Sequence, residues 1–331
     1  MKPYKISVIL AAYHGEAYIG EQLKSLFTQT RPPDEIVIGD DSADDATRLA
    51  IESVKHEYNG ELRYIKNEPR RGFLQNFVNL AREATGDMIF FCDQDDVWLP
   101  GKIEFLSGYL EQNPDVEVVA CESEMVDAER KPYNRTVLDW VSDLPQKTAE
   151  INAGGGIQYI LNSTILFSGH NMAIRRSFLP LFLQITDIYT YHDYWIALVG
   201  IYFGSFRFIN KVFTQFRVHS TNAVTPFLRE NNQTLWSRFQ NICKSSDDIF
   251  RIETLLGEFY KFAQSHSDNP NFRMVKNSYI FYSIRAKILR KNRFVRWFFL
   301  LIYGPVYFSR GTGLRSFIRD FLASEIREQR K

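Results

Sequence analysis

The sequence predicts an α/β protein with a mainly parallel sheet flanked by helices, followed by a helical C-terminal region. Strand-like and helix-like patterns alternate over the first 125 residues, acidic residues follow two of the strands directly, and only helical patterns occur after about residue 228. A chain of 331 residues can bury a large core without disulfides. Its three cysteines are scattered, so we expect a reducing compartment and neither a disulfide framework nor a structural zinc site.

The first predicted strand is Ile6–Ala12, a continuous apolar run typical of a strand that is covered on both faces. Glu16–Thr30 carries apolar residues at helical spacing, and Arg31-Pro32-Pro33 ends it. The alternation continues with strands at Glu35–Gly39, Leu62–Lys66, Asp87–Cys92 and Glu117–Met125, and with helices at Asp44–Tyr58, Phe73–Ala84 and Pro100–Asn113.

The second half of the sheet region is less regular. Residues 126–167 are polar and predict a long excursion over the sheet edge. A short strand at Ser168–Ala173, a helix at Asp193–Phe203 and one or two strands within Phe206–Arg217 follow. The predicted division is an α/β domain at 1–225, with halves at 1–125 and 126–225, and a helical region at 226–331.

The charge of the chain is distributed unevenly. Residues 271–331 carry a net charge of +11 and the remaining 270 residues a net charge of −10. The basic C-terminal region also contains many aromatic residues, which indicates either a surface that contacts anionic lipids or a tail packed on the body or on a second subunit. Ile6–Ala12 is too short for a signal peptide, and no run reaches the roughly 18 to 20 apolar residues that span a bilayer.

The strongest chemical signal is Asp93-Gln94-Asp95-Asp96 at the exit of an apolar strand. Three carboxylates at neighbouring positions repel one another and favour a divalent cation, and oxygen ligands without cysteine select Mg²⁺ or Mn²⁺. The alternative is a solvated acidic turn that caps the next helix. In open α/β sheets, ligands bind beyond the carboxyl ends of the strands, which is where these residues stand.

Other polar segments carry two interpretations each. Asp40 and Asp41 can accept hydrogen bonds from a ribose or a pyrimidine, while Ser42 or Asp44 can cap the following helix. Asp193 can be a general base or a helix cap, and Trp195 could then stack on a sugar. A histidine such as His219 after a strand is either structural or a distant metal ligand. The phosphate-binding GxxxxGK[ST], the dinucleotide-binding GxGxxG after the first strand and the GxSxG nucleophile motif are all absent from the sequence.

Taken in order, these segments resemble the family-two glycosyltransferases with the GT-A fold over roughly residues 5–225. ISVILAAYHGEAYIGEQLKSLFTQT resembles the opening strand and helix of that family, and EIVIGDDSADDAT resembles its second strand. RRGFLQNFVNLAREATGDMIFFCDQDDVWLPGKI is similar to its central segment, which ends in the DxD motif. HDYW and FRVHSTN are similar to its base motif and its C-terminal metal histidine.

The resemblance implies a role for each matching residue. Asp193 would be the catalytic base, and Asp95 and His219 would hold the metal. In the sugar and acceptor pocket, His192 stands where many members have Glu. The nucleotide-sugar residues would be Ala12, Tyr13, Glu16, Asp40, Asp41, Arg71, Gly72, Asp93 and Asp96, and the acceptor or sugar pocket would contain His170, Asn171, His192 and Trp195.

The resemblance also implies an inverting, Mg²⁺- or Mn²⁺-dependent transfer to a glycan or lipid-linked glycan acceptor in surface polysaccharide synthesis, such as O-antigen or capsule. HDYW and DQDDVW resemble rhamnosyltransferase-like members, which suggests dTDP-rhamnose as donor, with a UDP-hexose as the alternative. We expect a cytoplasmic protein, peripheral on the inner face of the cell membrane, that does not bind nucleic acid and that contacts a membrane surface or forms a homo-oligomer. Two other classes, a receiver-like signalling domain and a sugar-binding pseudoenzyme, fit fewer of the motifs.

Overall fold

The computed structural model describes residues 4–140, 144–161, 167–189, 191–219, 246–291 and 293–308, together with 316, 317 and 320. The chain divides into two compact units, which are described separately. The first contains 1–160 and 164–222, and the second contains 161–163 and 223–331. The predicted boundary at 225/226 lies outside the described residues, and the division of the first unit into halves stays a prediction.

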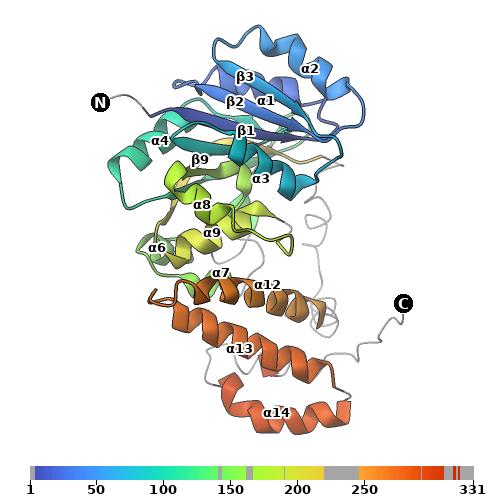
Figure 1. Cartoon of the computed structure of the whole chain (residues 1–331), viewed down its shortest axis with the longest axis vertical. Helices are drawn as coiled ribbons and strands as arrows, with labels where there is room; N and C mark the ends of the chain where they lie inside the picture. Colours follow the sequence, from blue (N-terminus) through green and yellow to red (C-terminus); the bar gives the residue numbers. More distant parts are fainter. Residues whose placement is uncertain are drawn as a thin grey trace. The chain divides into compact units, whose positions relative to one another are not determined.

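The first unit begins with the predicted alternation of strands and helices (Figure 1). Ile51 and Val54 of one helix and Ile19, Leu23 and Leu26 of another are buried at helical spacing, as amphipathic helices on a sheet require. The elements are β1 (Ile6–Ala12), α1 (Ile19–Phe27), β2 (Glu35–Asp40), α2 (Ala46–Lys55), β3 (Glu61–Lys66), α3 (Phe73–Glu83), β4 (Met88–Asp93), β5 (Val97–Trp98), α4 (Lys102–Gln112) and β6 (Val118–Val126).

The rest of the first unit completes the sheet. The predicted excursion at 126–167 contains a strand and three short helices in its described part, which its polar composition did not indicate. The two-residue strand β5 was also not predicted. The elements are β7 (Pro132–Thr136), α5 (Val137–Trp140), α6 (Leu144–Asn152), α7 (Ile157–Leu161), η1 (Gly169–Asn171), β8 (Met172–Arg175), η2 (Arg176–Phe178), α8 (Leu179–Phe182), α9 (His192–Tyr202) and β9 (Phe206–Arg217).

The sheet has the order β3-β2-β1-β4-β8-β6-β9-β5, with β7 paired to β6. Its first four strands are parallel, as predicted. The second half is mixed, because β8 runs antiparallel to both β4 and β6, whereas β9 is parallel to β6. As a result β1, β2, β4, β6 and β9 all end at the same edge of the sheet, which is where we expected the site.

Helices cover both faces of this sheet. Alternate residues of β1 point to opposite faces. Ile6, Val8 and Leu10 pack in a core with residues of α1, α2 and α4. On the other face, Phe77 of α3 contacts Phe91 of β4, with 5.8 Å between the ring centroids. Covered faces explain why β1 is almost continuously apolar and why both β1 and β2 are buried.

The second unit is helical in its described part, as the sequence predicted. It contains α12 (Ser246–Gln264), α13 (Phe272–Leu289) and α14 (Arg293–Phe308). Arg285 of α13 forms a buried two-bond ion pair with Asp320, at 2.7 and 2.8 Å. Among the described residues, none of the helices combines the length and the apolar character needed to cross a membrane.

Candidate active site

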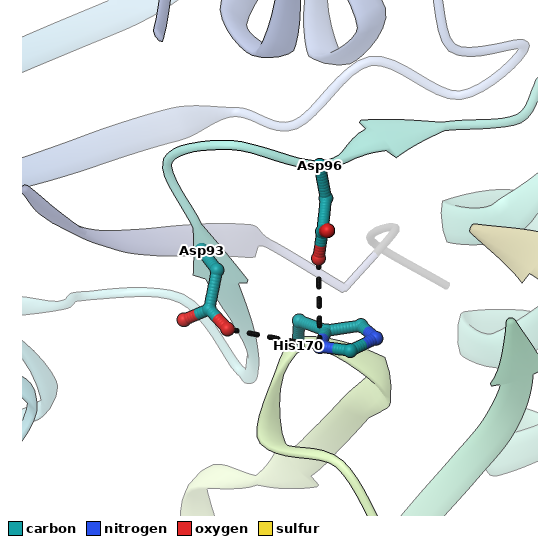
Figure 2. Close-up of side chains that lie close together, drawn as sticks. All are labelled: Asp93, Asp96 and His170. Atoms are coloured by element: carbon teal, nitrogen blue, oxygen red, sulfur yellow. Dashed lines mark ion pairs between the residues drawn. The ribbon is translucent and has the colours of Figure 1, made fainter. Parts of the chain in front are cut away.

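Acidic and imidazole side chains meet at the edge where the parallel strands end. Figure 2 shows Asp93 at the end of β4, Asp96 just before β5, and His170 in η1, with both carboxylates directed at the imidazole ring. His170 Nδ1 lies 3.6 Å from Asp93 Oδ2 and 3.4 Å from Asp96 Oδ2. Asp96 and His170 are buried, and Asp93 is partly exposed. The antiparallel insertion of β8 brings η1 beside the end of β4, a pairing that spacing in the sequence does not indicate.

Asp95 faces a different histidine. Its Oδ2 lies 2.9 Å from His219 Nε2, and His219 is the second residue after the end of β9. The structure therefore brings together the two residues that the sequence proposed as metal ligands. Their neighbours Asp93, Asp96 and His170 form a second group whose ligand atoms all lie within 4.8 Å of one another and could hold a metal ion.

The donor set fits a divalent cation. It is made of carboxylate oxygens and imidazole nitrogens, without a thiolate. Asp96 Oδ2 is buried and has no hydrogen-bond partner among the described residues. Burial and the nearby Asp95 and Asp93 charges raise the pKa of Asp96 to about 7. A buried carboxylate oxygen without a hydrogen-bond donor is costly, and nearby positive charge, from a bound cation or from the His170 N–H side of the ring 3.4 Å away, would offset that cost.

The structure places Asp193 next to this cluster. Asp193 is in the first turn of α9. Its Oδ1 accepts a hydrogen bond from the Tyr194 backbone N–H at 2.6 Å, and its Oδ2 accepts one from the Gly169 N–H at 3.2 Å. Burial is the main cause that raises the pKa of Asp193 to about 7. A carboxyl group with this pKa suits a general base that works near neutral pH. Gly169 precedes His170, so η1 links the base to the acidic cluster.

Two predicted pocket residues of α9 are buried. Trp195 is 1% exposed and donates its indole N–H to the Leu181 carbonyl at 3.2 Å, so its ring faces the interior and does not fit a sugar-stacking platform. His192 lies among Phe73, Phe77 and Phe91, and neither of its ring nitrogens has a partner in the described residues. Burial lowers the pKa of His192 to about 3, which keeps the ring neutral.

Asp41 holds together the loop that precedes α3. It accepts hydrogen bonds from Asn67 Nδ2 at 2.9 Å, from the Arg71 backbone N–H at 3.1 Å and from the Gly72 backbone N–H at 2.8 Å. Gly72 has a φ of +80°, a conformation that favours glycine. Three predicted nucleotide residues are thus adjacent, and Asp41 already acts as an acceptor for the other two.

Asp40 is fully buried at the end of β2. Its Oδ1 accepts from the Ser42 backbone at 2.8 Å and the Ser42 hydroxyl at 2.5 Å, and its Oδ2 accepts from Tyr64 OH at 2.8 Å. Burial, together with this hydrogen bond, raises the pKa of Tyr64 above its ordinary range. The observed contacts of Asp40 are therefore internal and order the turn after β2.

Gln94, in the segment between β4 and β5, forms hydrogen bonds with the residue that follows β1. The Tyr13 backbone N–H donates to Gln94 Oε1 at 2.9 Å, and Gln94 Nε2 donates to the Tyr13 carbonyl at 3.0 Å. Tyr13 is 42% exposed, with the Arg70 guanidinium 3.8 Å from its ring centroid. The other two residues predicted at the nucleotide are Ala12, whose carbonyl accepts from Asp41 N–H, and Glu16, which accepts from the Thr47 hydroxyl.

Four further residues contact the site, and sequence reasoning assigned no role to them: Arg217, Glu21, Gln94 and Lys102. Arg217 is 3% exposed and donates to the Asp95 carbonyl at 2.8 Å and to Glu21. Lys102 is fully buried. Lysine and arginine are seldom buried without a partner, but no pattern in the sequence marks which of the 40 basic residues are buried. The available signals were the position of Gln94 within the segment Asp93–Asp96 and that of Arg217, two residues before His219.

Comparison with known proteins decides the family. A model described as glycosyl transferase family 2 matches residues 7–181, more than half of the chain. The chain belongs to this family. An uncharacterized glycosyltransferase of Haemophilus influenzae is 31% identical over 114 residues, which are 34% of this chain and 37% of that protein. The putative glycosyltransferase EpsE of Bacillus subtilis is 29% identical over 116 residues, or 35% and 41%.

A third relative, the uncharacterized glycosyltransferase alr2836 of Nostoc, is 26% identical over 231 residues, 66% of each chain. The matches thus span about two fifths to two thirds of these relatives. Staphylococcus aureus TarS with UDP-GlcNAc shares the fold at a TM-score of 0.53 and 16% identity, over 96% of this chain and 89% of that one. The mannosyltransferase PcManGT of Pyrobaculum calidifontis, solved with GDP-Man and Mn²⁺, also reaches 0.53, at 17% identity, over 97% and 86%. The predicted GT-A-type fold is confirmed.

Proposed function

We propose that this family 2 protein is an inverting, divalent-metal-dependent glycosyltransferase. One observation carries the proposal: Asp193, a carboxyl with a pKa near 7, is joined through Gly169 to the cluster of Asp93, Asp96 and His170. Asp95 and His219, the proposed metal ligands, adjoin this cluster. A general base beside a cation site serves the two demands of the reaction, which are deprotonation of an acceptor hydroxyl and stabilisation of a nucleoside diphosphate leaving group.

In the proposed reaction, Asp193 accepts the proton of the acceptor hydroxyl as the oxygen attacks the anomeric carbon. The bond between that carbon and the diphosphate oxygen breaks, and the configuration inverts. Asp95 and His219 would hold Mg²⁺ or Mn²⁺, which stabilises the negative charge of the leaving diphosphate when it is bound. The Gly169 N–H holds Oδ2 of Asp193 and the Tyr194 N–H holds Oδ1, so backbone groups of η1 and α9 orient the carboxylate.

For the donor we propose dTDP-rhamnose, with a UDP-hexose as the alternative. HDYW and DQDDVW support the first. The second is supported by TarS, which shares this fold and was solved with UDP-GlcNAc. The acceptor would be a glycan or lipid-linked glycan of a surface polysaccharide. Tyr13, with Arg70 over its ring, and the loop held by Asp41 would contact the nucleobase.

A pair of variants tests this reaction. Asp193→Asn should lower the rate of sugar transfer on the order of 10²- to 10⁴-fold, while nucleoside diphosphate binding, measured by calorimetry, stays within about twofold of the wild type. Asp187→Asn is the matched control, because Asp187 contacts Gln75 at the surface and not the cluster. Full turnover by Asp193→Asn would show that Asp193 is not the base. Loss of nucleotide binding in the same variant would show that the carboxylate serves donor binding instead.

We further propose that the second unit contacts an anionic membrane surface. Val295, Phe298 and Ile302 of α14 are 38%, 64% and 54% exposed and share one helical face, whereas Arg296 and Leu300 are buried on the opposite face. Lys287, Arg290 and Lys291 are exposed where α13 leads to α14. Exposed apolar side chains beside exposed cations fit the interface of an anionic bilayer.

Co-sedimentation with vesicles tests this surface. Binding is expected to phosphatidylcholine vesicles that contain phosphatidylglycerol, to weaken with salt, and to be lost in the double variant Phe298→Ser, Ile302→Ser. Leu49→Ser is the control, since Leu49 is 61% exposed on α2 of the first unit. If the double variant instead dissociates a dimer and leaves vesicle binding unchanged, the face is a contact between two copies and the membrane proposal is wrong.

A further inference from the structure

A chain of buried hydrogen bonds runs from Lys102 to the back of the acidic cluster. Lys102 Nζ donates to the Thr214 hydroxyl at 2.7 Å, and that hydroxyl donates to Asn171 Oδ1 at 2.8 Å. Asn171 Nδ2 donates to the Ser123 hydroxyl at 2.5 Å, which lies 2.9 Å from His170 Nε2. All five side chains are buried. They come from α4, β9, η1 and β6.

The direction of this chain follows from Lys102. An ammonium group only donates, so Thr214 accepts and its own hydrogen is available for Asn171. The carbonyl end of Asn171 therefore faces Thr214, and its amide hydrogens face Ser123. The Ser123 oxygen accepts from Asn171, and its remaining hydrogen finds one acceptor among the described residues, which is His170 Nε2.

The last link determines where the proton of His170 resides. An imidazole nitrogen that accepts a hydrogen bond carries no hydrogen, so in the neutral ring the hydrogen is on Nδ1. Nδ1 is the atom that lies 3.4 Å and 3.6 Å from the Asp96 and Asp93 carboxylates (Figure 2). Their negative charge favours a hydrogen at the same atom. The hydrogen bond at Nε2 and the carboxylate charges near Nδ1 thus both favour a hydrogen on Nδ1.

Lys102 is well placed to keep this direction. It is 0% exposed, it also donates to the His170 carbonyl at 2.7 Å, and its Nζ lies 3.8 Å from the centroid of the Trp98 ring. No carboxylate lies within ion-pair distance of Lys102 in the part of the chain that the structure describes. In low dielectric, such a charge polarises the hydrogen bonds that it begins.

We propose that this chain holds the hydrogen of His170 on Nδ1 and makes the ring a positioning group for Asp93 and Asp96, not a metal ligand. The imidazole N–H then restrains the two carboxylates from behind, and coordination of a cation is left to the side of Asp95 and His219. Lys102, Thr214, Asn171 and Ser123 are positioning residues that act through His170. The inference rests on the proposed function only for its effect on turnover.

Nitrogen NMR of the metal-free, full-length protein with ¹⁵N-labelled histidine tests the proposal. The chain has six histidines, and the His170 signals are assigned by their loss in His170→Gln. In the wild type, Nδ1 should be protonated and Nε2 bare. Thr214→Val, which keeps the shape but removes the hydroxyl, should shift the ring toward the Nε2–H tautomer, whereas Thr214→Ser should leave it unchanged.

Ser123→Ala provides the second variant, because it removes the hydroxyl next to the ring and should produce the same shift even if Thr214→Val does not fold. Ser107→Ala is its control: Ser107 is a buried hydroxyl on α4 that accepts from Arg31 and does not touch the cluster. Hydrogen on Nε2 in the wild type, whether the ring is neutral or charged, overturns the proposal. So does an unchanged spectrum in Ser123→Ala.

Activity gives a separate readout. Thr214→Val should lower the Mn²⁺ affinity and kcat by on the order of 10-fold to 100-fold relative to Thr214→Ser, as expected when a group behind a metal site is lost. Equal kinetics in the two variants would contradict the positioning role. Absence of glycosyl transfer in the wild type and in every variant, together with the predicted tautomer shifts, would overturn the proposed function. The inference about the hydrogen-bond chain would then still hold.

Discussion

Arg217 donates its Nε–H to the main-chain carbonyl of Asp95, 2.8 Å away, and so fixes the backbone of a proposed metal ligand from the end of β9. The same residue's backbone N–H donates to Asp96 Oδ1 at 3.2 Å, and its guanidinium donates to Glu21 of α1. Asp95 and His219 therefore stand at a junction that one buried arginine holds together. Loss of a group that orients metal ligands typically lowers metal affinity on the order of 10-fold to 100-fold.

Replacement of Arg217 should loosen this junction. We expect Arg217→Gln to lower Mn²⁺ affinity by on the order of 10-fold or more, since Asp95 loses its backbone restraint and Glu21 loses one of its two arginine partners. Calorimetric titration with Mn²⁺ in the presence of the nucleoside diphosphate measures this. Arg207→Gln, at the start of the same strand and paired with Asp115, should bind like the wild type. Equal weakening of both variants would contradict a specific role for Arg217.

The raised pKa of Asp193 predicts a pH dependence. Only the ionised carboxylate can accept a proton, so kcat/KM should fall as the pH decreases through about 7 and level off above it. The pKa of Asp96 is raised to the same range, so either carboxyl group could cause this fall. The pH profile of the residual activity of Asp193→Asn distinguishes the two groups. The residual rate should be lower on the order of 10²- to 10⁴-fold and should lose the acidic limb. An unchanged limb in this variant would assign it to another group.

The paired amide of Gln94 predicts an effect on donor binding. Gln94→Glu keeps the shape and the bond from Tyr13 N–H but replaces the donor that faces the Tyr13 carbonyl with an acceptor. The loss of about 1 to 3 kcal/mol at this contact should raise the KM for the donor more than it lowers kcat. Gln184→Glu is the control, as Gln184 donates to a backbone carbonyl at the surface of α8. An equal KM for the donor in both variants would show that the pair of hydrogen bonds between Gln94 and the Tyr13 backbone does not shape the donor site.

The close packing of Gly39 against Asn76 predicts that a substitution there affects both stability and the loop before α3 that Asp41 holds. An added Cβ would lie 2.1 Å from Asn76 Oδ1 and 3.2 Å from Leu80 Cδ2, so Gly39→Ala must displace Asn76, which contacts Asn67 beside Asp41. The expected loss in the free energy of unfolding is about 1 to 3 kcal/mol, with weaker nucleotide binding. Gly108→Ala, in open space on α4, should instead gain about 0.5 to 1 kcal/mol. Urea denaturation compares them, and equal stabilities would contradict the crowding at Gly39.

The first half of the fold could be predicted from the sequence because its signals are local. Continuous apolar runs, helical spacing and the acidic residues after β4 each fall within one segment. The mixed half could not, because the pairing of β8 with β4 and β6 depends on long-range contacts that leave no periodic signal. The strand at Pro132–Thr136 was obscured because its side chains are mostly polar and exposed.

The site was predicted in part for the same reason. Residues directly after strands were found, and the structure brings Asp93, Asp95, Asp96, Asp193 and His219 to one edge. The stacking role of Trp195 was not supported, because aromatic residues in a helix give no indication from sequence of whether they face the core or a ligand. Lys102 and Arg217 act through burial, which a single sequence does not reveal.

The central claim is metal-dependent transfer from a nucleotide sugar, and donor hydrolysis tests it most directly. The purified chain is incubated with dTDP-rhamnose or UDP-sugars, with Mn²⁺, with Mg²⁺ or with EDTA, and released nucleoside diphosphate is measured. We predict slow release from dTDP-rhamnose that EDTA abolishes and that Asp95→Ala reduces. Release from a UDP-sugar instead would replace the donor and keep the mechanism. Absence of release from every donor, together with no thermal shift on adding nucleotide, would contradict the proposed enzyme.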